Sequence, residues 1–313
     1  MLKFIHTRVG AAALSVASNT TLVAIKLTVG LLIGSVSVLS EGIHSMVDLL
    51  ASVIAFLSLR MATRPADEEH PFGHGKVENV SGTVEGVLIF LGAGLIVYEA
   101  VDKILAGSEV GNVDLGVGVM LVSVAVNVLV SRHLLRVAAA TDSVALEADA
   151  RHLTTDILTS AGVAAGLLVV RITDVHVLDP VLGMLVALII LRTAAVVTFH
   201  AFSGLVDRSL PEPELAEIRR SIQEHVGEVV GFHELRTRKA GSERHIDLHL
   251  VMPRDVSLEE AHGMADHLEE DILRKLPRSA VTIHMEPCDL ASEGCNDSCP
   301  LNERQRRRCR QQS

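Results

Sequence analysis

Two histidine–aspartate pairs with the same four-residue spacing lie in apolar parts of the chain, His44 with Asp48 and His152 with Asp156. Residues four apart lie one turn above one another on a helix, so each pair presents an imidazole nitrogen and a carboxylate oxygen on one face. Two such helices would supply two nitrogens and two oxygens. That set suits a borderline ion such as Zn²⁺ in tetrahedral geometry better than Ca²⁺ or Mg²⁺.

The position of these pairs is more informative than their spacing, because a single H-x-x-x-D is common by chance. A charged carboxylate at the centre of a membrane helix costs about 3 kcal/mol on insertion scales, so such residues usually face a polar interior and serve function. We therefore expect Asp48 and Asp156 to face each other inside a helix bundle, around one divalent ion.

The composition indicates a membrane protein with a soluble part. Of 313 residues, 49% are hydrophobic and the mean hydropathy is +0.38, yet 21% are charged and the formal net charge is −10. The sequence is apolar up to about residue 205 and rich in Glu, Arg and His from Asp207 onward. We predict a transmembrane domain over 1–208, a soluble domain over 209–290 and a disordered tail over 291–313.

Six stretches are long enough to cross a bilayer, which takes roughly 20 residues. They are 9–34, 36–62, 79–105, 113–136, 145–171 and 177–205. If these spans alternate in direction, most Lys and Arg residues of the short connections fall on one side, which predicts that both termini are cytoplasmic. The first stretch is too long for a cleaved signal peptide. We expect a multi-pass protein of the cell membrane, the inner membrane if the source is bacterial.

Beyond Pro213 the hydrophobic pattern changes to that of a small α+β domain. Ile246, Leu248 and Leu250 alternate with polar residues, as expected of a strand with one buried face. The whole pattern predicts the order αββαβ. Its elements are a helix at 213–226, strands at 230–239 and 244–252, a helix at 257–275 and a strand at 280–286.

The cysteines gather at the end of the chain, which we expect to be cytoplasmic and reducing, so disulfide bonds are not expected. They are Cys288, Cys295, Cys299 and Cys309. The spacing of the first three is compatible with a thiolate metal site, whereas the residues around them are typical of a poorly ordered tail. Both interpretations stand at this point.

Three separate segments resemble the signature regions of one transporter family. Residues 40–48 (SEGIHSMVD) are similar to its second-helix signature, residues 149–156 (DARHLTTD) to its fifth-helix motif, and residues 67–78 (DEEHPFGHGKVE) to its cytoplasmic loop. Over nearly its whole length the sequence resembles the cation diffusion facilitators, the zinc-transporting group of proton-coupled exporters. Agreement at three places is hard to obtain by chance.

The resemblance implies a transport site in the membrane and a second metal site on the loop. The transport site comprises His44, Asp48, His152 and Asp156, and the loop site comprises Asp67, His70 and His74. A histidine at position 44 is typical of zinc-restricted members, whereas cadmium carriers often have Asp there. That favours Zn²⁺ without excluding cobalt or nickel. Without the resemblance, His70 and His74 would be interpreted as solvent-facing loop residues.

For the soluble domain, the resemblance implies a metallochaperone-like fold that dimerises and holds zinc near the dimer contact. The implied ligands are His233, His249, His262, His284 and Glu286, which the sequence alone would place on the surface. The resemblance also implies a charge pair between Lys76 and Asp207 that joins the two domains. Glu41 shares a helical face with His44; it either lines the outward mouth of the pathway or lies in water at a span end.

These features predict a homodimeric efflux transporter that exchanges divalent cations for protons by alternating access. Zn²⁺ is the expected substrate and the expected structural or regulatory ion. Protons compete with the metal because its ligands must be deprotonated. The alternative is a membrane-anchored zinc sensor or scaffold that binds metal without transporting it. The sequence has no Walker-type glycine loop and no H-E-x-x-H motif. We therefore expect neither enzymatic activity nor an ATP-driven pump, and no nucleic-acid partner.

Overall fold

The computed structural model describes residues 5–33, 36–106, 114–173, 178–225, 229–254 and 256–288. The side chains of Glu41 and His44 lie outside this description, as do the tail predicted over 291–313 and the cysteines at 295, 299 and 309. The described residues form two compact units, one up to Leu205 and one from Val206 onward.

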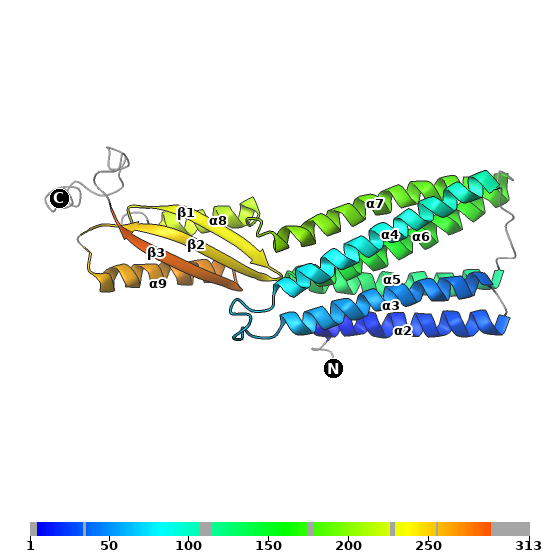
Figure 1. Ribbon diagram of the computed structural model, residues 1–313, viewed down its shortest axis with the longest axis horizontal. Helices are drawn as coiled ribbons and strands as arrows, with labels where there is room; N and C mark the ends of the chain where they lie inside the picture. Colours follow the sequence, from blue (N-terminus) through cyan, green and yellow to red (C-terminus); the bar gives the residue numbers. More distant parts are fainter. Residues whose placement is uncertain are drawn as a thin grey trace. The chain divides into compact units, whose positions relative to one another are not determined.

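The first unit consists, in its described residues, of six long helices that run side by side (Figure 1). They are α2 (Arg8–Ile33), α3 (Val36–Ala62), α4 (Lys76–Ala106), α5 (Asp114–Thr141), α6 (Val144–Thr173) and α7 (Leu178–Leu205). Each contains most of one predicted apolar stretch and has 26 to 31 residues. At 1.5 Å per residue the helices are about 39 to 46 Å long, which exceeds a hydrocarbon core of about 30 Å.

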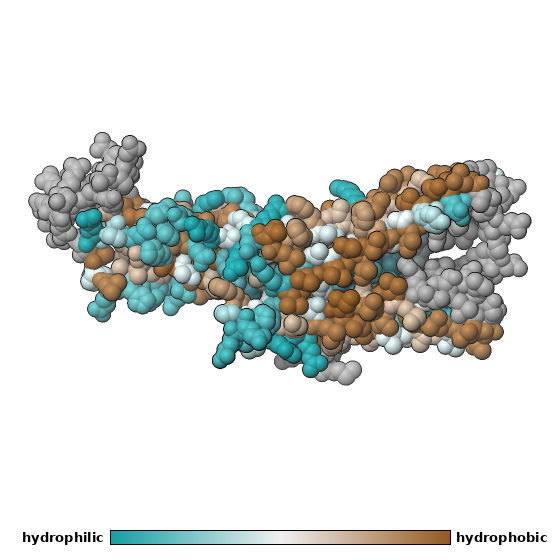
Figure 2. Space-filling model, viewed as in Figure 1, coloured by the Kyte–Doolittle hydropathy of each residue, from teal (hydrophilic) through white to brown (hydrophobic). Residues whose placement is uncertain are grey.

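Apolarity agrees with length in five of these helices. Within the described residues α2, α3, α4, α5 and α7 each contain a window long and apolar enough to cross a membrane. Helix α6 is not among them, and its first half carries Glu147, Asp149, Arg151 and Asp156. Figure 2 shows apolar residues gathered over the surface of this unit. Such a surface is rare in water-soluble monomers and suits contact with lipid.

Small residues allow α4 and α7 to approach closely. Gly82 and Gly86 lie four residues apart on one face of α4. A Cβ added at Gly82 would lie 3.1 Å from the Cβ of Ala201, and one added at Gly86 would lie 2.9 Å from the backbone nitrogen of Thr198. The spacing is that of a small-xxx-small contact, in which membrane helices pack through van der Waals interactions.

The other four helices share a second core. Leu59 of α3, Leu134 of α5 and Leu146 and Leu153 of α6 are at most 1% exposed and belong to one buried cluster. Helix α2 contributes alanines to the same cluster. This packing fixes the rotation of α6 about its axis. Because His152 directly precedes Leu153, the packing also sets the direction in which His152 leaves the helix.

The second unit confirms the predicted αββαβ order. Its elements are α8 (Glu212–Glu224), β1 (Gly231–Ala240), β2 (Glu243–Met252), α9 (Leu258–Lys275) and β3 (Ser279–Pro287). The sheet has the order β1-β2-β3, antiparallel between β1 and β2 and parallel between β2 and β3. Ile218 and Ile222 of α8, Ile272 of α9 and Leu248 of β2 share one buried core. Both helices therefore cover the same face of the sheet, and no described helix of this unit packs on the other, which is called the open face below.

The strand register aligns three histidines across the open face. His249 of β2 pairs with His233 of β1 and with His284 of β3. The β1–β2 register shifts between His233 and Arg236, and Glu234 in this bulge has a φ of 50°. A bulge of this kind re-aims nearby side chains. In the described residues, the predicted class is thus confirmed: a helical membrane domain followed by an α+β domain with three strands.

Candidate metal centres

Asp48 of α3 and His152 and Asp156 of α6 come together inside the helical unit. Each offers one ligand atom, and these three atoms lie within 4.8 Å of one another. Nε2 of His152 lies 3.0 Å from Oδ1 of Asp48, at hydrogen-bond distance. Asp48 and His152 are each 6% exposed, and Asp156 is half-buried. Two helices far apart in the sequence therefore place one nitrogen and two carboxylates around a common point.

The predicted fourth ligand and the predicted pathway mouth lie on α3 as well. His44 lies one turn before Asp48 in this helix, so the backbone places both residues on the same helical face. The side chains of His44 and Glu41 lie outside the described residues. Their roles stay predictions.

A network of buried polar side chains connects α2, α3 and α6 beside this cluster. Nδ2 of Asn19 donates to Oγ of Ser52 at 2.6 Å, and the hydroxyl of Ser52 donates to Oδ1 of Asp149 at 3.2 Å. Nζ of Lys26 donates to Oγ of Ser45 at 2.8 Å. Chains of hydrogen bonds strengthen one another in a low-dielectric interior. The network holds α3 in place against α2 and α6, and with it Asp48.

Two further buried carboxylates lie near the cluster, Glu85 of α4 and Asp149 of α6. They are 0% and 1% exposed, respectively. Oε2 of Glu85 and Oδ2 of Asp149 are buried without a hydrogen-bond partner among the described residues. Glu85 interacts electrostatically with both Asp149 and His152. Sequence reasoning assigned neither residue to the site. The available signal was a carboxylate within an apolar stretch, which is costly in a membrane.

Asp67, His70 and His74 form a second cluster, on the connection between α3 and α4. Their ligand atoms lie within 4.8 Å of one another. The backbone N–H of His70 donates to Oδ1 of Asp67 at 2.7 Å, and Nε2 of His74 lies 3.3 Å from Oδ2. The hydrogen bond from the His70 backbone lowers the pKa of Asp67 from its ordinary 3.8. The carboxylate is therefore ionised at neutral pH, as a metal ligand must be.

His233, His249 and Glu286 form a third cluster, on the open face of the sheet. Their ligand atoms also lie within 4.8 Å of one another. Nε2 of His233 lies 3.0 Å from Oε2 of Glu286, and Nδ1 of His249 lies 2.8 Å from Oε1. His284 adjoins the cluster, with its ring centroid 4.7 Å from that of His249. Desolvation raises the pKa of Glu286, but hydrogen bonds from His249 and His233 outweigh it, and the net shift from 4.5 is downward.

His262 is the predicted ligand that stands apart from this third cluster. It lies on α9, where its Nδ1 is 3.5 Å from Oδ1 of Asp266. Ala261 and Leu268 of the same helix pack into the core on the covered face of the sheet. The described residues of one chain do not bring His262 to Glu286, and its role as a ligand stays a prediction.

The predicted charge pair between Lys76 and Asp207 joins residues of different units, and it stays a prediction. Within its own unit, Nζ of Lys76 donates to the carbonyl oxygen of Leu205 at 3.4 Å. Oδ1 of Asp207 accepts a hydrogen bond from Nη1 of Arg238 at 3.4 Å. Cys288, the cysteine within the described residues, is buried and not in a disulfide.

Comparison with known proteins covers both units. Residues 12–206 match the model of the cation efflux transmembrane domain, and residues 210–288 match that of the cation efflux protein cytoplasmic domain. The uncharacterized transporter sll1263 of Synechocystis sp. is 34% identical over 278 residues, or 89% of this chain and 90% of the relative.

The similarity extends to a transporter named for its activity. The cation-efflux pump FieF of Salmonella paratyphi A is 32% identical over 282 residues, which are 90% of this chain and 93% of the relative. A solved structure of CzrB is 38% identical and covers 26% of this chain and 100% of that chain, with a TM-score of 0.25.

Proposed function

The chain belongs to the cation diffusion facilitator family of membrane cation efflux transporters, and from this premise we propose that it exports Zn²⁺ in exchange for protons. One observation carries the proposal: helices α3 and α6 bring the ligand atoms of Asp48, His152 and Asp156 within 4.8 Å of one another. With His44 as fourth ligand, the set has two nitrogens and two oxygens. Tetrahedral Zn²⁺ accepts such a set, whereas Ca²⁺ and Mg²⁺ require more oxygens.

Proton exchange follows from the atoms that the metal would use. Nε2 of His152 and Oδ1 of Asp48 lie at hydrogen-bond distance, so a proton shared by these two atoms would take the place of a cation. Binding of Zn²⁺ releases that proton, and protonation releases the ion. Histidine has an unperturbed pKa of about 6.5, which makes His152 and His44 suitable proton carriers. Asp156 and Asp48 offset the charge of the desolvated ion.

By alternating access, this site would open first to one side of the membrane and then to the other. The six helices, α6 included, would span the bilayer and leave both termini in the cytoplasm. The transmembrane domain would comprise 1–208, the cytoplasmic domain 209–290 and the tail 291–313. The bundle must have two arrangements for the ion to bind on one side and leave on the other. Glu41 would line the outward mouth. Lys76 and Asp207 would pair at the hinge between the domains.

The two outer clusters would bind Zn²⁺ in regulatory or structural roles. The cluster of Asp67, His70 and His74 lies on the connection between α3 and α4, and that of His233, His249 and Glu286 on the open face of the sheet. Both combine imidazole with carboxylate, the ligand types that Zn²⁺ accepts. The match to the family's cytoplasmic domain supports a homodimer, in which His262 and His284 would complete the cytoplasmic site.

Flux through reconstituted vesicles tests the proposal. Purified protein in vesicles with an acidic lumen is expected to accumulate Zn²⁺ more rapidly than Cd²⁺, Mn²⁺, Fe²⁺, Co²⁺ or Ni²⁺, and each uptake is expected to raise the luminal pH. Asp48→Asn is expected to lower the Zn²⁺ rate at least tenfold, since changes even beyond the direct ligands of a metal cost about 10–100-fold. The matched control is Asp102→Asn, which changes an exposed acid of α4.

Two results would contradict the proposal. Transport by Asp48→Asn at the wild-type rate would remove the assigned site. Zinc binding without flux in the wild-type protein would favour the sensor or scaffold.

A further inference from the structure

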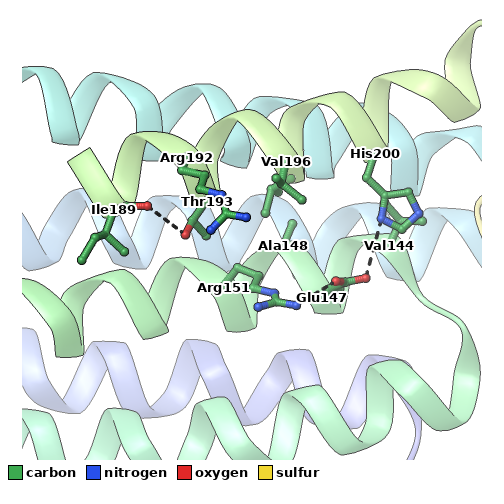
Figure 3. A pocket seen from close by; sticks show the side chains of 10 residues that line it. Val144, Glu147, Ala148, Arg151, Ile189, Arg192, Thr193, Val196 and His200 are labelled. Carbon is green, nitrogen blue, oxygen red and sulfur yellow. Dashed lines mark hydrogen bonds and ion pairs between the residues drawn. The ribbon is translucent and has the colours of Figure 1, made fainter. Parts of the chain in front are cut away.

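A groove of about 190 Å³ lies between α6 and α7 (Figure 3). Basic side chains enter it from both helices: Arg151 from α6, and Arg192 and His200 from α7. Figure 3 shows the guanidinium group of Arg192 between the two helices and that of Arg151 directed along α6 toward Glu147. The lining contains one acidic residue, Glu147. The groove therefore has more positive than negative groups.

The ion pairs within the groove leave positive charge unmatched. Nη2 of Arg151 lies 3.5 Å from Oε1 of Glu147, and Nδ1 of His200 lies 3.9 Å from Oε2 of the same carboxylate. Glu147 is thus shared between two partners. Arg192 has no ion pair among the residues that the structure describes. Two guanidinium groups against one carboxylate leave an excess of one positive charge, and protonated His200 would add a second.

The walls of the groove are apolar and open to the outer surface of the helical unit. Ile189 is 55% and Val196 62% exposed, and both line the groove. Arg192 lies 13 residues before the end of α7 at Leu205, a distance of about 20 Å along the helix. His200 lies about 8 Å from the same end. Both residues therefore lie in the second half of α7, the half that ends at Leu205.

An exposed arginine among lipid chains is costly unless an anion accompanies it. Basic pockets between membrane helices bind anionic lipid headgroups, and the planar fork of an arginine binds a phosphate through two parallel hydrogen bonds. A lipid would also use the apolar walls, along which its acyl chains can lie. A soluble anion would leave Ile189 and Val196 uncovered.

We propose that this groove binds one anionic phospholipid, with the phosphate held by Arg151 and Arg192 and the acyl chains along Ile189 and Val196. The lipid would brace α6, the helix that carries His152 and Asp156, against α7. This site is separate from the three metal clusters, and its test does not depend on transport.

Native mass spectrometry of the full-length protein, delipidated in neutral detergent, tests the proposal. Phosphatidylglycerol is expected to bind at least about tenfold more tightly than phosphatidylcholine. Arg192→Gln is expected to weaken phosphatidylglycerol binding about tenfold, because a charge-assisted bidentate contact is lost, and to leave phosphatidylcholine unaffected. The matched control is Arg136→Gln, which removes an exposed arginine of α5 outside the groove and is expected to change neither affinity.

Three results would overturn the proposal: equal binding of the two lipids, undiminished phosphatidylglycerol binding by Arg192→Gln, or a disulfide between two copies of Val196→Cys in native membranes. The last result would make the groove a contact between protomers. If Arg192→Gln fails to fold, Arg151→Gln gives the same test. Arg192→Lys keeps the charge without the fork and is expected to lose only a few-fold in affinity.

Discussion

Gly86 offers a quantitative test of the packing between α4 and α7. In Gly86→Ala the new Cβ would lie 2.9 Å from the backbone nitrogen and 3.0 Å from the Cα of Thr198. Carbon atoms in ordinary contact are about 3.5–4.0 Å apart, so the two backbones must separate by roughly half an ångström or more. Overpacking of this kind costs about 1–3 kcal/mol. A rotation of the Thr198 side chain does not relieve it, because both atoms belong to the backbone.

Gly92→Ala is the matched control on the same helix, since a Cβ there meets nothing within 4 Å. Both substitutions gain about 1 kcal/mol of helix propensity, so their difference isolates the contact with Thr198. We expect Gly86→Ala to be less stable than Gly92→Ala by about 1–3 kcal/mol. Thermal unfolding of the purified protein in detergent measures this difference, at about 2–4 °C per kcal/mol for domains of this size. Equal melting temperatures for the two variants would refute the close approach of α4 and α7.

Three further predictions concern local contacts. Nη1 of Arg8 lies 2.5 Å from Oε1 of the buried Glu78. Arg8→Gln is therefore expected to lower the free energy of unfolding by about 3 kcal/mol, because it leaves a buried carboxylate without its partner. The double variant with Glu78→Gln is expected to lose less in thermal unfolding, and an equally unstable double variant would contradict this. Ser257 caps α9 by accepting a hydrogen bond from the backbone of Glu260, and Ser257→Ala is expected to cost about 1 kcal/mol of stability in denaturant melts. The hydrogen bond from the His70 amide lowers the pKa of Asp67 below its ordinary 3.8. The stability that this bond contributes is therefore fully present above pH 3.8, and it is lost as the pH falls through the lower pKa of the folded state. In ¹⁵N-histidine spectra the amide shift of His70 would then titrate below 3.8, and a midpoint at or above 3.8 would contradict the contact.

The helices and strands could be predicted well from hydrophobic periodicity. The strand predicted at 244–252 is observed as Glu243–Met252, and the helix predicted at 257–275 as Leu258–Lys275. The third predicted span began at 79, whereas α4 begins at Lys76. Its polar first turn lowers the local hydropathy, but Glu78 is buried there by its contact with Arg8. A window of hydropathy cannot detect a pairing between residues 70 positions apart.

Local spacing could predict which residues of one helix share a face, but not which helices meet. His152 and Asp156 follow from the spacing of four, whereas the contact between His152 and Asp48 depends on how α3 packs against α6. For the same reason Glu85 was missed: its approach to His152 depends on α4. For the third cluster, the resemblance implied the ligands, but their spacing in the sequence does not show that they lie together. The register of β1, β2 and β3 aligns His233, His249 and His284.

The sequence alone also could not predict which helix packs against the small residues of α4. Gly82 and Gly86 fit a small-xxx-small pattern that is frequent in membrane helices. Only the structure shows that this face of α4 meets Ala201 and Thr198 of α7. The groove between α6 and α7 likewise depends on two antiparallel helices that bring Arg151 and Arg192 together.

The most direct test of the central claim is the position of a bound ion. Crystals of the full-length protein grown with Zn²⁺ would be measured at the zinc absorption edge, where anomalous difference density locates the ion. We predict a peak about 2.0–2.2 Å from Nε2 of His152 and from carboxylate oxygens of Asp48 and Asp156, and its loss in Asp48→Asn. Peaks at the clusters of Asp67 and Glu286 with none beside His152 would contradict the assigned transport site.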